Sequence, residues 1–258
     1  MLIAPSLDNG LVIELDGNVT SRPYIDMTLS ILNKLGIYAK FNDNTIIIKP
    51  KKDEIINTEY KVEADWSSAS YFFSIVALSK NIELSFLNFR KDSFQGDINV
   101  CKYYELFGVK TTFQNGKLII KKRTDFNYPE KIIIDLKDNP DLAQTIIVTA
   151  FGLNIPTKLT GLSTLKVKET DRIEALRNEL TNLGASCIID DESIEFFKSN
   201  KLNKNYIINT YDDHRMALAF APISVIFPIE IQDPKVVSKS FPEFWNILEK
   251  LNFSIDFV

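Results

Sequence analysis

The sequence predicts an α/β protein built from a repeated βαβαββ unit, and three observations support this class. Amphipathic helix patterns end at Gly36, Gly108, Gly184 and Asn252, with spacings of 72, 76 and 68 residues. A short alternating hairpin pattern follows each of the first three helices. A second helix pattern, small and apolar on nearly every side, recurs earlier in each unit. A regular period of this kind indicates a repeat architecture rather than unrelated elements.

The elements follow in a fixed order: strand, buried helix, strand, amphipathic helix and hairpin. Gly or Asn directly after a helix is the usual left-handed cap, and polar turns join the hairpin strands. Helices that are apolar all round belong inside a domain. First strands are expected at residues 60–63, 132–135 and 206–210, and buried helices at 67–78, 141–151 and 214–226. Hairpins are expected at 37–41 with 45–48, 109–113 with 118–121, and 186–189 with 193–197.

Residues 1–58 match only the last part of such a unit. Their amphipathic helix opens at Ser21-Arg22-Pro23-Tyr24, with Pro in the first turn where it favours helix initiation. The first strand and the buried helix of this unit are not found in the sequence. The start at Met1-Leu2-Ile3-Ala4-Pro5 carries no charged leader, and we expect it to be a cut through a domain.

Composition excludes several functional classes. The 258 residues include 30 Lys and Arg against 34 Asp and Glu, so the net charge of -4 gives no general attraction to nucleic acid. The two cysteines, Cys101 and Cys187, exclude a disulfide scaffold. The single histidine, His214, excludes any site that requires two histidines, and we expect no metal. Catalytic chemistry must therefore depend on carboxylates, Lys and Arg.

No membrane segment is expected. The longest apolar run, residues 216–231, is interrupted by Pro222, Ser224 and Pro228. The sequence also shows no signal peptide, and with few cysteines it favours a cytoplasmic location.

Charged residues cluster where loops enter helices. Lys168-Glu169-Thr170-Asp171-Arg172 precedes an amphipathic helix, and taken alone it fits a solvated helix cap. His214 and Arg215 open a buried helix, where an anionic partner explains them better, although a lone His is more often structural. Asp65, Asp141 and the pair Asp212-Asp213 precede the buried helices, and a simple role as N-caps would account for them. Lys239 lies in a loop, and taken alone it is explained as an ordinary surface lysine.

Together these loops offer four cations, Lys168, Arg172, Arg215 and Lys239, beside two carboxylates, Asp141 and Glu169. Arg binds carboxylate and phosphate in bidentate fashion, and Lys acts as a point charge. The pattern therefore predicts a site for a polyanionic small molecule, with carboxylates available for proton transfer.

Several motifs resemble one family in the right order along the chain. They are residues 168–172 (KETDR), 211–217 (YDDHRMA), 233–234 (DP) with 238–242 (SKSFP), 65–72 (DWSSASYF), 95–97 (QGD) and 21–26 (SRPYID). The sequence is similar to EPSP synthase (3-phosphoshikimate 1-carboxyvinyltransferase) from residue 1 to its end.

The resemblance implies an inside-out α/β prism of two domains, each with three βαβαββ units and the active site between them. Residues 1–62 would then be the last part of the N-terminal domain, and residues 63–258 the C-terminal domain. The implied reaction transfers the enolpyruvyl group of phosphoenolpyruvate to the 5-hydroxyl of shikimate 3-phosphate and releases phosphate. It needs no metal or organic cofactor, and the family is typically monomeric.

The resemblance also implies residue roles. Asp141 would contact the shikimate hydroxyls and accept a proton, and Glu169 would act near the methylene carbon of phosphoenolpyruvate. Arg172 and Arg215 would hold its carboxylate, and Lys239 its phosphate. The residues implied for shikimate 3-phosphate are Ser21, Tyr24, Asp141, Thr164 and Lys168. His214 would lie near the site.

The sequence departs from the family pattern in four respects. Thr164 stands where many members have Asn, and Arg22 and Ser240 replace the commoner Lys and Thr. The family's N-terminal phosphate-binding Lys and Arg, its Gly-rich loop and its Ser-Ser-Gln block have no counterpart here. We therefore expect little synthase activity from this chain alone.

Two alternatives stay open. One is a truncated, inactive copy that keeps its shape without catalysis. The other is a relative of UDP-N-acetylglucosamine enolpyruvyl transferase, which lacks the pairing of residues 168–172 with 212–215.

Overall fold

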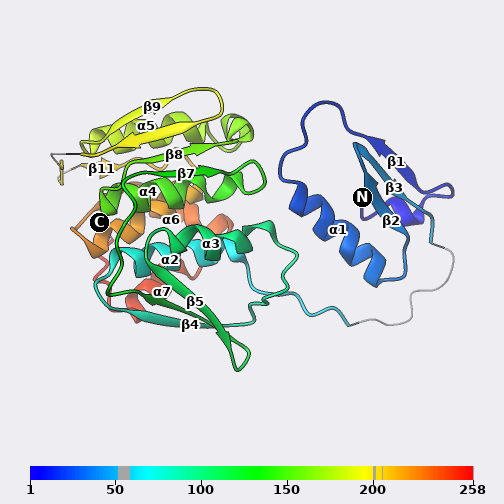
Figure 1. The fold of residues 1–258 in the computed structure, drawn as a ribbon, viewed down its shortest axis with the longest axis horizontal. Helices are drawn as coiled ribbons and strands as arrows, with labels where there is room; N and C mark the ends of the chain where they lie inside the picture. The colour runs from blue at the N-terminus through cyan, green and yellow to red at the C-terminus, as the bar shows by residue number, and fades with distance from the viewer. Residues whose placement is uncertain (52–58, 200–201, 205, 258) are drawn as a thin grey trace.

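The computed structural model describes residues 1–51, 59–199, 202–204 and 206–257 (Figure 1). Two hydrophobic clusters lie within these residues. The smaller cluster is formed by residues of the first 48 positions, and the larger one begins at Trp66. Part of the predicted tail segment, residues 52–58, lies outside the described residues, and the division at residue 62 stays a prediction.

The N-terminal part contains one three-stranded antiparallel sheet and one helix. A 3-10 turn, η1 (Ala4–Ser6), precedes strand β1 (Leu11–Glu14), helix α1 (Arg22–Lys34) and the hairpin β2 (Ala39–Asn42) and β3 (Thr45–Ile48). The strand order is β1-β3-β2. Leu29 and Leu32 of α1 pack with Ile46 and Ile48 of β3 in the smaller cluster. This strand, helix and hairpin sequence is the second half of the predicted repeat unit.

One complete βαβαββ unit occupies the middle of the chain. It contains β7 (Ile132–Asp135), η3 (Pro140–Leu142), α4 (Ala143–Leu153), β8 (Thr157–Thr160), η4 (Ser163–Val167), α5 (Arg172–Asn182), β9 (Ser186–Ile189) and β10 (Ile194–Phe197). The sheet order is β7-β8-β10-β9. Strand β7 runs parallel to β8, and the hairpin adds antiparallel strands. The predicted unit is therefore confirmed here in full.

The two flanking units contain fewer strands in the described residues. The earlier one has α2 (Trp66–Leu78), β4 (Glu83–Leu87), η2 (Gly96–Asn99), α3 (Val100–Glu105), β5 (Val109–Gln114) and β6 (Lys117–Lys122), in the sheet order β4-β6-β5. The later one has β11 (Ile207–Ile208), α6 (His214–Phe220), η5 (Ala221–Val225), β12 (Glu230–Ile231), η6 (Pro234–Lys239) and α7 (Phe244–Lys250). Strands β11 and β12 pair in parallel.

The expected strand at residues 60–63 is wrong. This stretch runs past the end of β4, where the Ala64 N–H donates to the Asn88 carbonyl and the Asn88 amide donates to Val62. Val62 is 73% exposed, so the alternating pattern buries little here. The strand expected at residues 206–210 forms only over its centre, Ile207–Ile208.

Two of the predicted buried helices differ from the expected bounds, the first by a displacement of two residues and the second by an early end. The helix placed at residue 141 begins at Ala143, after a 3-10 turn that contains Pro140. The helix placed at 214–226 ends at Phe220 and continues as a 3-10 segment through Pro222. Proline has no N–H to donate and its ring clashes with the preceding turn, which explains the second ending.

Helix ends follow the predicted capping chemistry. Gly36, Gly108 and Gly184 have φ of 78°, 75° and 99°, and Asn252 has φ of 67°. These left-handed residues end the amphipathic helices, as the sequence predicts.

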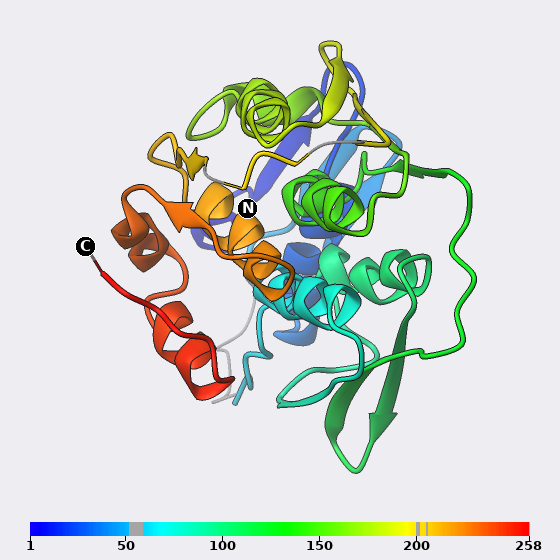
Figure 2. The ribbon, with the colours of Figure 1, turned by 90° about the vertical axis from the view of Figure 1, so that its left-hand side faces the viewer.

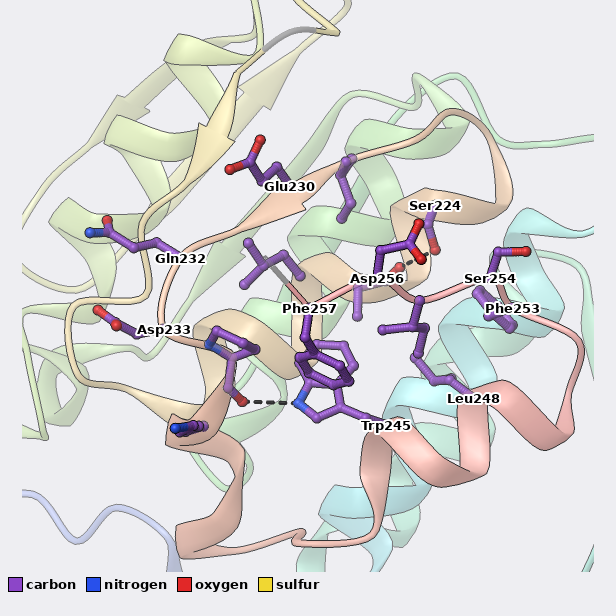
Figure 3. Close-up of a pocket in the computed structure, with 16 residues that line it drawn as sticks. Ser224, Glu230, Gln232, Asp233, Trp245, Leu248, Phe253, Ser254, Asp256 and Phe257 are labelled. Carbon is purple, nitrogen blue, oxygen red and sulfur yellow. Dashed lines mark hydrogen bonds between the residues drawn. The ribbon is translucent and has the colours of Figure 1, made fainter.

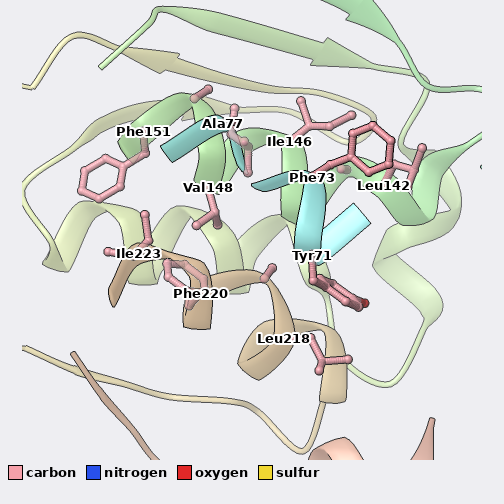
Figure 4. Packing of buried hydrophobic residues seen from close by; sticks show 14 of the residues in the cluster. Tyr71, Phe73, Ala77, Leu142, Ile146, Val148, Phe151, Leu218, Phe220 and Ile223 are labelled. Carbon is pink, nitrogen blue, oxygen red and sulfur yellow. The ribbon is translucent and has the colours of Figure 1, made fainter. Parts of the chain in front are cut away.

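Helices α2, α4 and α6 form the centre of the larger part. Tyr71 and Phe73 of α2, Ile146 and Val148 of α4, and Phe220 of α6 all belong to the larger core cluster (Figure 4). The sheets lie at the periphery of this helical centre (Figure 2). Among the described residues, no helix combines the length and apolar character needed to cross a membrane.

Candidate functional site

The charged residues singled out in the sequence converge at the amino ends of helices α4, α5 and α6. Asp141 lies in η3 ahead of α4, and Glu169 follows η4. Arg172 is the first residue of α5, and Arg215 lies in the first turn of α6. Residues that are 74 positions apart in the sequence thus come into direct contact.

Arg172 is the centre of this cluster, and its side chain is 2% exposed. Its Nε donates to Asp213 Oδ2 at 2.6 Å, and Nη1 donates to Asp141 Oδ1 at 2.9 Å. Nη2 donates to Glu169 Oε2 at 2.6 Å and to Asp213 Oδ1 at 3.2 Å. A guanidinium can be buried in this way because three carboxylates balance its charge and accept its hydrogens. A substrate carboxylate at Arg172 would have to compete with these protein carboxylates.

Asp141 is shared between three cations. Arg215 donates from Nη1 to the Asp141 carbonyl at 3.1 Å and from Nη2 to Oδ2 at 3.3 Å. Lys168 Nζ lies 3.7 Å from Oδ1, on the side of Arg172. Burial alone would raise the pKa of Asp141, but Arg215, Lys168 and Arg172 together hold that pKa below its usual value. Asp141 is therefore an ionised hydrogen-bond acceptor at neutral pH.

The capping interpretation holds for two of the three acidic residues. Asp65 accepts from the N–H groups of Ser67 and Ser68 at 3.2 and 2.9 Å, and is the N-cap of α2. Asp213 accepts from the Arg215 N–H at 2.8 Å and caps α6. Asp141 makes no such bond, because its carboxylate faces the cations instead.

His214 lies beside the cluster. Its Nδ1 is 3.7 Å from both Glu169 Oε1 and Asp213 Oδ1, beyond hydrogen-bond distance. This buried nitrogen has no hydrogen-bond partner among the described residues. Burial lowers the pKa of the imidazole despite the nearby carboxylates, which favours the neutral form.

The N-terminal part reaches the cluster through Tyr24 on α1. The Tyr24 hydroxyl lies near the carboxylates of Asp97 and Asp141, and burial together with these charges raises its pKa. Ser21 is left-handed, with φ of 53°, and its N–H donates to the Lys137 carbonyl at 3.0 Å. Tyr24 thus lies near the cluster, while the Ser21 contacts in the structure are with the backbone.

Lys239 and Thr164 lie at the margin of the charged cluster around Arg172. Lys239 Nζ donates to the Asp212 carbonyl at 2.9 Å, next to the capping Asp213. The Thr164 hydroxyl oxygen is buried in η4 and has no hydrogen-bond partner among the described residues. The hydrogen bonds and ion pairs of the described residues therefore connect Lys239, but not Thr164, to the cluster.

The sequence analysis did not single out Asp213 and Asp97 as site residues. Asp213 is fully buried and balances Arg172. Asp97 is also fully buried, accepts the hydroxyl of Ser67 and lies near the hydroxyl of Tyr24. Both lie inside motifs of charged residues, but only the fold shows which acidic residue of each motif points inward.

The charged cluster disfavours a metal ion held jointly by Glu169, Asp213 and His214. Glu169, Asp213 and His214 bring their ligand atoms within 4.8 Å of one another. The Arg172 guanidinium already donates to both carboxylates and supplies the positive charge there. An added metal ion would be repelled at close range.

A cavity of about 670 Å³ lies apart from this cluster, near the carboxyl end of the chain (Figure 3). Trp245, Leu248 and Phe257 line it, and the Trp245 indole N–H donates to the Pro234 carbonyl at 2.9 Å. None of the predicted site residues contributes to its wall.

Solved structures show the same fold. The chain matches EPSP synthase of Acinetobacter baumannii with a TM-score of 0.71 and 21% identity, over 96% of this chain and 58% of that one. It matches the enolpyruvyl transferase NikO of Streptomyces tendae with a TM-score of 0.66 and 12% identity, over 99% and 58%. The predicted fold class, βαβαββ repeats in an inside-out α/β prism, is confirmed, and this fold is that of the enolpyruvyl transferases.

The sequence comparison is more specific. A sequence model of EPSP synthase (3-phosphoshikimate 1-carboxyvinyltransferase) matches residues 1–248. The chain is 39% identical to the 3-phosphoshikimate 1-carboxyvinyltransferase of Bacteroides fragilis (strain YCH46), over 99% of this chain and 62% of that protein. For the enzyme of Pseudoalteromonas translucida the identity is 33%, over 98% and 58%. The chain belongs to the EPSP synthase family, and it spans about three fifths of the length of these relatives.

Proposed function

We propose that this chain supplies part of the substrate site for enolpyruvyl transfer from phosphoenolpyruvate to shikimate 3-phosphate. The observation that carries the proposal is the joint contact of Arg172, Arg215 and Lys168 with Asp141 at the amino ends of α4, α5 and α6. Preorganised cations of this kind stabilise the charge that develops between two phosphates and a carboxylate. Membership of the EPSP synthase family supports the choice of substrates.

The roles follow from position and charge. Asp141 is an ionised acceptor that a substrate hydroxyl can reach, since its side chain is 25% exposed. Glu169, at 36% exposure, is open for proton transfer at the methylene carbon. Lys239 is exposed and can reach a phosphate beyond Asp212. Lys168, which lies beside Asp141, and Tyr24 would hold shikimate 3-phosphate together with Ser21 and Thr164.

Arg172 takes a modified role in this proposal. Because its donors already bind three carboxylates, we propose that phosphoenolpyruvate displaces the exposed Glu169 side chain from Nη2. Arg215 then also binds the substrate carboxylate. Domain closure would exclude water from such a site. The proposed setting is a cytoplasmic monomer that acts on small molecules.

The first test is acceptor binding measured by titration calorimetry. Shikimate 3-phosphate should bind the purified 258-residue chain, and Asp141→Ala should weaken the affinity about tenfold. UDP-N-acetylglucosamine should give no binding heat. The proposal fails if shikimate 3-phosphate does not bind, or if only UDP-N-acetylglucosamine does.

Phosphate release separates binding from turnover. With phosphoenolpyruvate and shikimate 3-phosphate together, we expect binding but little phosphate release by this chain alone. Normal turnover would overturn that expectation and leave the substrate proposal supported. Binding of neither substrate would point to the alternative of a catalytically inactive copy.

A further inference from the structure

Helix α5 contains a buried carboxylate that the proposed chemistry does not use. Glu179 lies two turns after Arg172 and is fully buried. No Lys, Arg or His among the described residues forms an ion pair with it. A buried carboxyl group without a cation must be stabilised by hydrogen bonds, so its donors indicate what it holds.

The donors to Glu179 all come from the segment that joins β11 to α6 or from the residue just before β11. The Tyr211 hydroxyl donates to Oε1 at 2.7 Å, and the Asn209 backbone N–H donates to Oε2 at 3.0 Å. The Asn209 side-chain amide and the Tyr206 hydroxyl approach Oε1 at 3.4 Å each. One carboxylate thus receives both side-chain and backbone hydrogens from a single loop.

This loop is strained. Tyr211 and Asp212 are consecutive left-handed residues, with φ of 55° and 57°. Such conformations are unfavourable for residues other than Gly and persist only where their surroundings fix them. Asp213, His214 and Arg215 follow immediately, and the Asp212 carbonyl accepts from Lys239. The strained turn therefore sets the direction of much of the charged cluster.

We infer that Glu179 is a positioning residue that holds the Asn209–Asp212 turn, so that Asp213, Arg215 and Lys239 face the site. Helix α5 contacts this segment at two points. Arg172 donates to Asp213, and Glu179 accepts from Asn209 and Tyr211. The expected effect of Glu179 on substrate affinity rests on the proposed function. Its effect on the conformation of the turn does not depend on that function.

The test compares Glu179→Gln with Glu174→Gln on the same helix. Gln keeps the size of the side chain but replaces one acceptor oxygen with a donor, which conflicts with the hydrogens it faces. Glu174 is 43% exposed and pairs with Arg177, so it is a matched control. Two quantities are measured under conditions in which the proteins stay folded. They are the hydrogen exchange of the Asn209 and Arg215 amides and the affinity for phosphoenolpyruvate.

Glu179→Gln should speed exchange at Asn209 and at Arg215, whose N–H donates to Asp213, and should weaken phosphoenolpyruvate binding about tenfold. Glu174→Gln should change neither. Unchanged exchange in Glu179→Gln, or equal changes in both variants, overturns the inference. Faster exchange at both amides with unchanged affinity assigns Glu179 a structural role alone and also overturns it.

Two provisions keep the result decisive. If Glu179→Gln does not fold, Tyr211→Phe removes one donor while leaving the carboxylate, and it should speed the same amides to a smaller extent. If the unaltered chain binds no phosphoenolpyruvate, the proposed function fails. The positioning role is then decided by exchange at Arg215 in these variants, which reports on the Asp213 carboxylate.

Discussion

At the scale of single residues, Arg172 connects the charged loops. Two of its carboxylate partners, Asp141 and Asp213, come from loops far away in sequence, and Asp213 is fully buried. The sequence predicts that cations and carboxylates gather here, since their types and motif order are readable. It does not predict that Arg172 is buried with its donors already bound to protein carboxylates, because that depends on how three loops pack against one another in the fold.

Arg172→Met should therefore destabilise the fold. Removing the guanidinium leaves Asp213 as a buried, uncompensated charge, and breaking a buried pair in this way costs about 3–5 kcal/mol. The free energy of unfolding in urea measures the effect. Arg177→Met, which breaks the solvent-exposed pair with Glu174, is the control and should change little. Equal losses in both variants would contradict the account.

Asp141 should make stability depend on acid pH. Its folded-state pKa is lowered, so the ionised carboxylate stabilises the fold above its unfolded pKa, and this contribution is lost as pH falls through the folded value. The unaltered chain should thus be more stable than Asp141→Asn at pH 7. The difference should shrink below about pH 4. Urea unfolding of both proteins at pH 7, 5 and 3.5 provides the comparison, and a constant difference would count against it.

At the scale of elements, local chemistry predicted most helix ends and hairpins. The left-handed Gly36, Gly108 and Gly184 lie where the sequence places helix caps. The failures have local causes as well. The stretch 60–63 has an alternating pattern but exposes Val62, and the helix from His214 is cut short by Pro222. Alternation predicts a strand only when a neighbouring strand accepts its hydrogen bonds.

Asp65 tests the capping chemistry of α2. Its carboxylate accepts from two backbone N–H groups and from the Ser68 hydroxyl. Asp65→Ala should lower the free energy of unfolding by about 1 kcal/mol. Thermal or urea denaturation measures this loss, and Asp65→Asn, which can still accept, should recover most of it. A loss of the same size in Asp65→Asn would mean that charge, rather than capping, is the cause.

At the scale of the whole molecule, the repeat count predicted the order of the elements and the central position of the apolar helices. The contact between α1 and the larger part was not predicted, because it depends on close packing. A Cβ placed on Gly96 would lie 2.7 Å from Pro23 Cβ and 2.8 Å from the Asn139 side-chain amide. Next to Gly96, the buried Asp97 lies near the Tyr24 hydroxyl.

Gly96→Ala should loosen this contact. The added methyl group would push Pro23 away and, with it, move the neighbouring Tyr24 relative to Asp97. The Ser21 amide, which donates to the Lys137 carbonyl, should then exchange its hydrogen faster. Exchange at the Leu35 amide, at the far end of the same helix, is the internal reference. Unchanged exchange at Ser21 would show that α1 is held by other contacts.

The central claim is that these cations form a site for phosphoenolpyruvate. The most direct test is its binding, in the presence of shikimate 3-phosphate, to the unaltered chain, to Lys239→Ala and to Lys235→Ala. Lys235 lies in the same 3-10 segment as Lys239, is likewise exposed, and is the matched control. We expect binding to the unaltered chain and to Lys235→Ala, with an affinity about tenfold lower in Lys239→Ala. Equal binding by all three proteins, or binding by none, would contradict the claim.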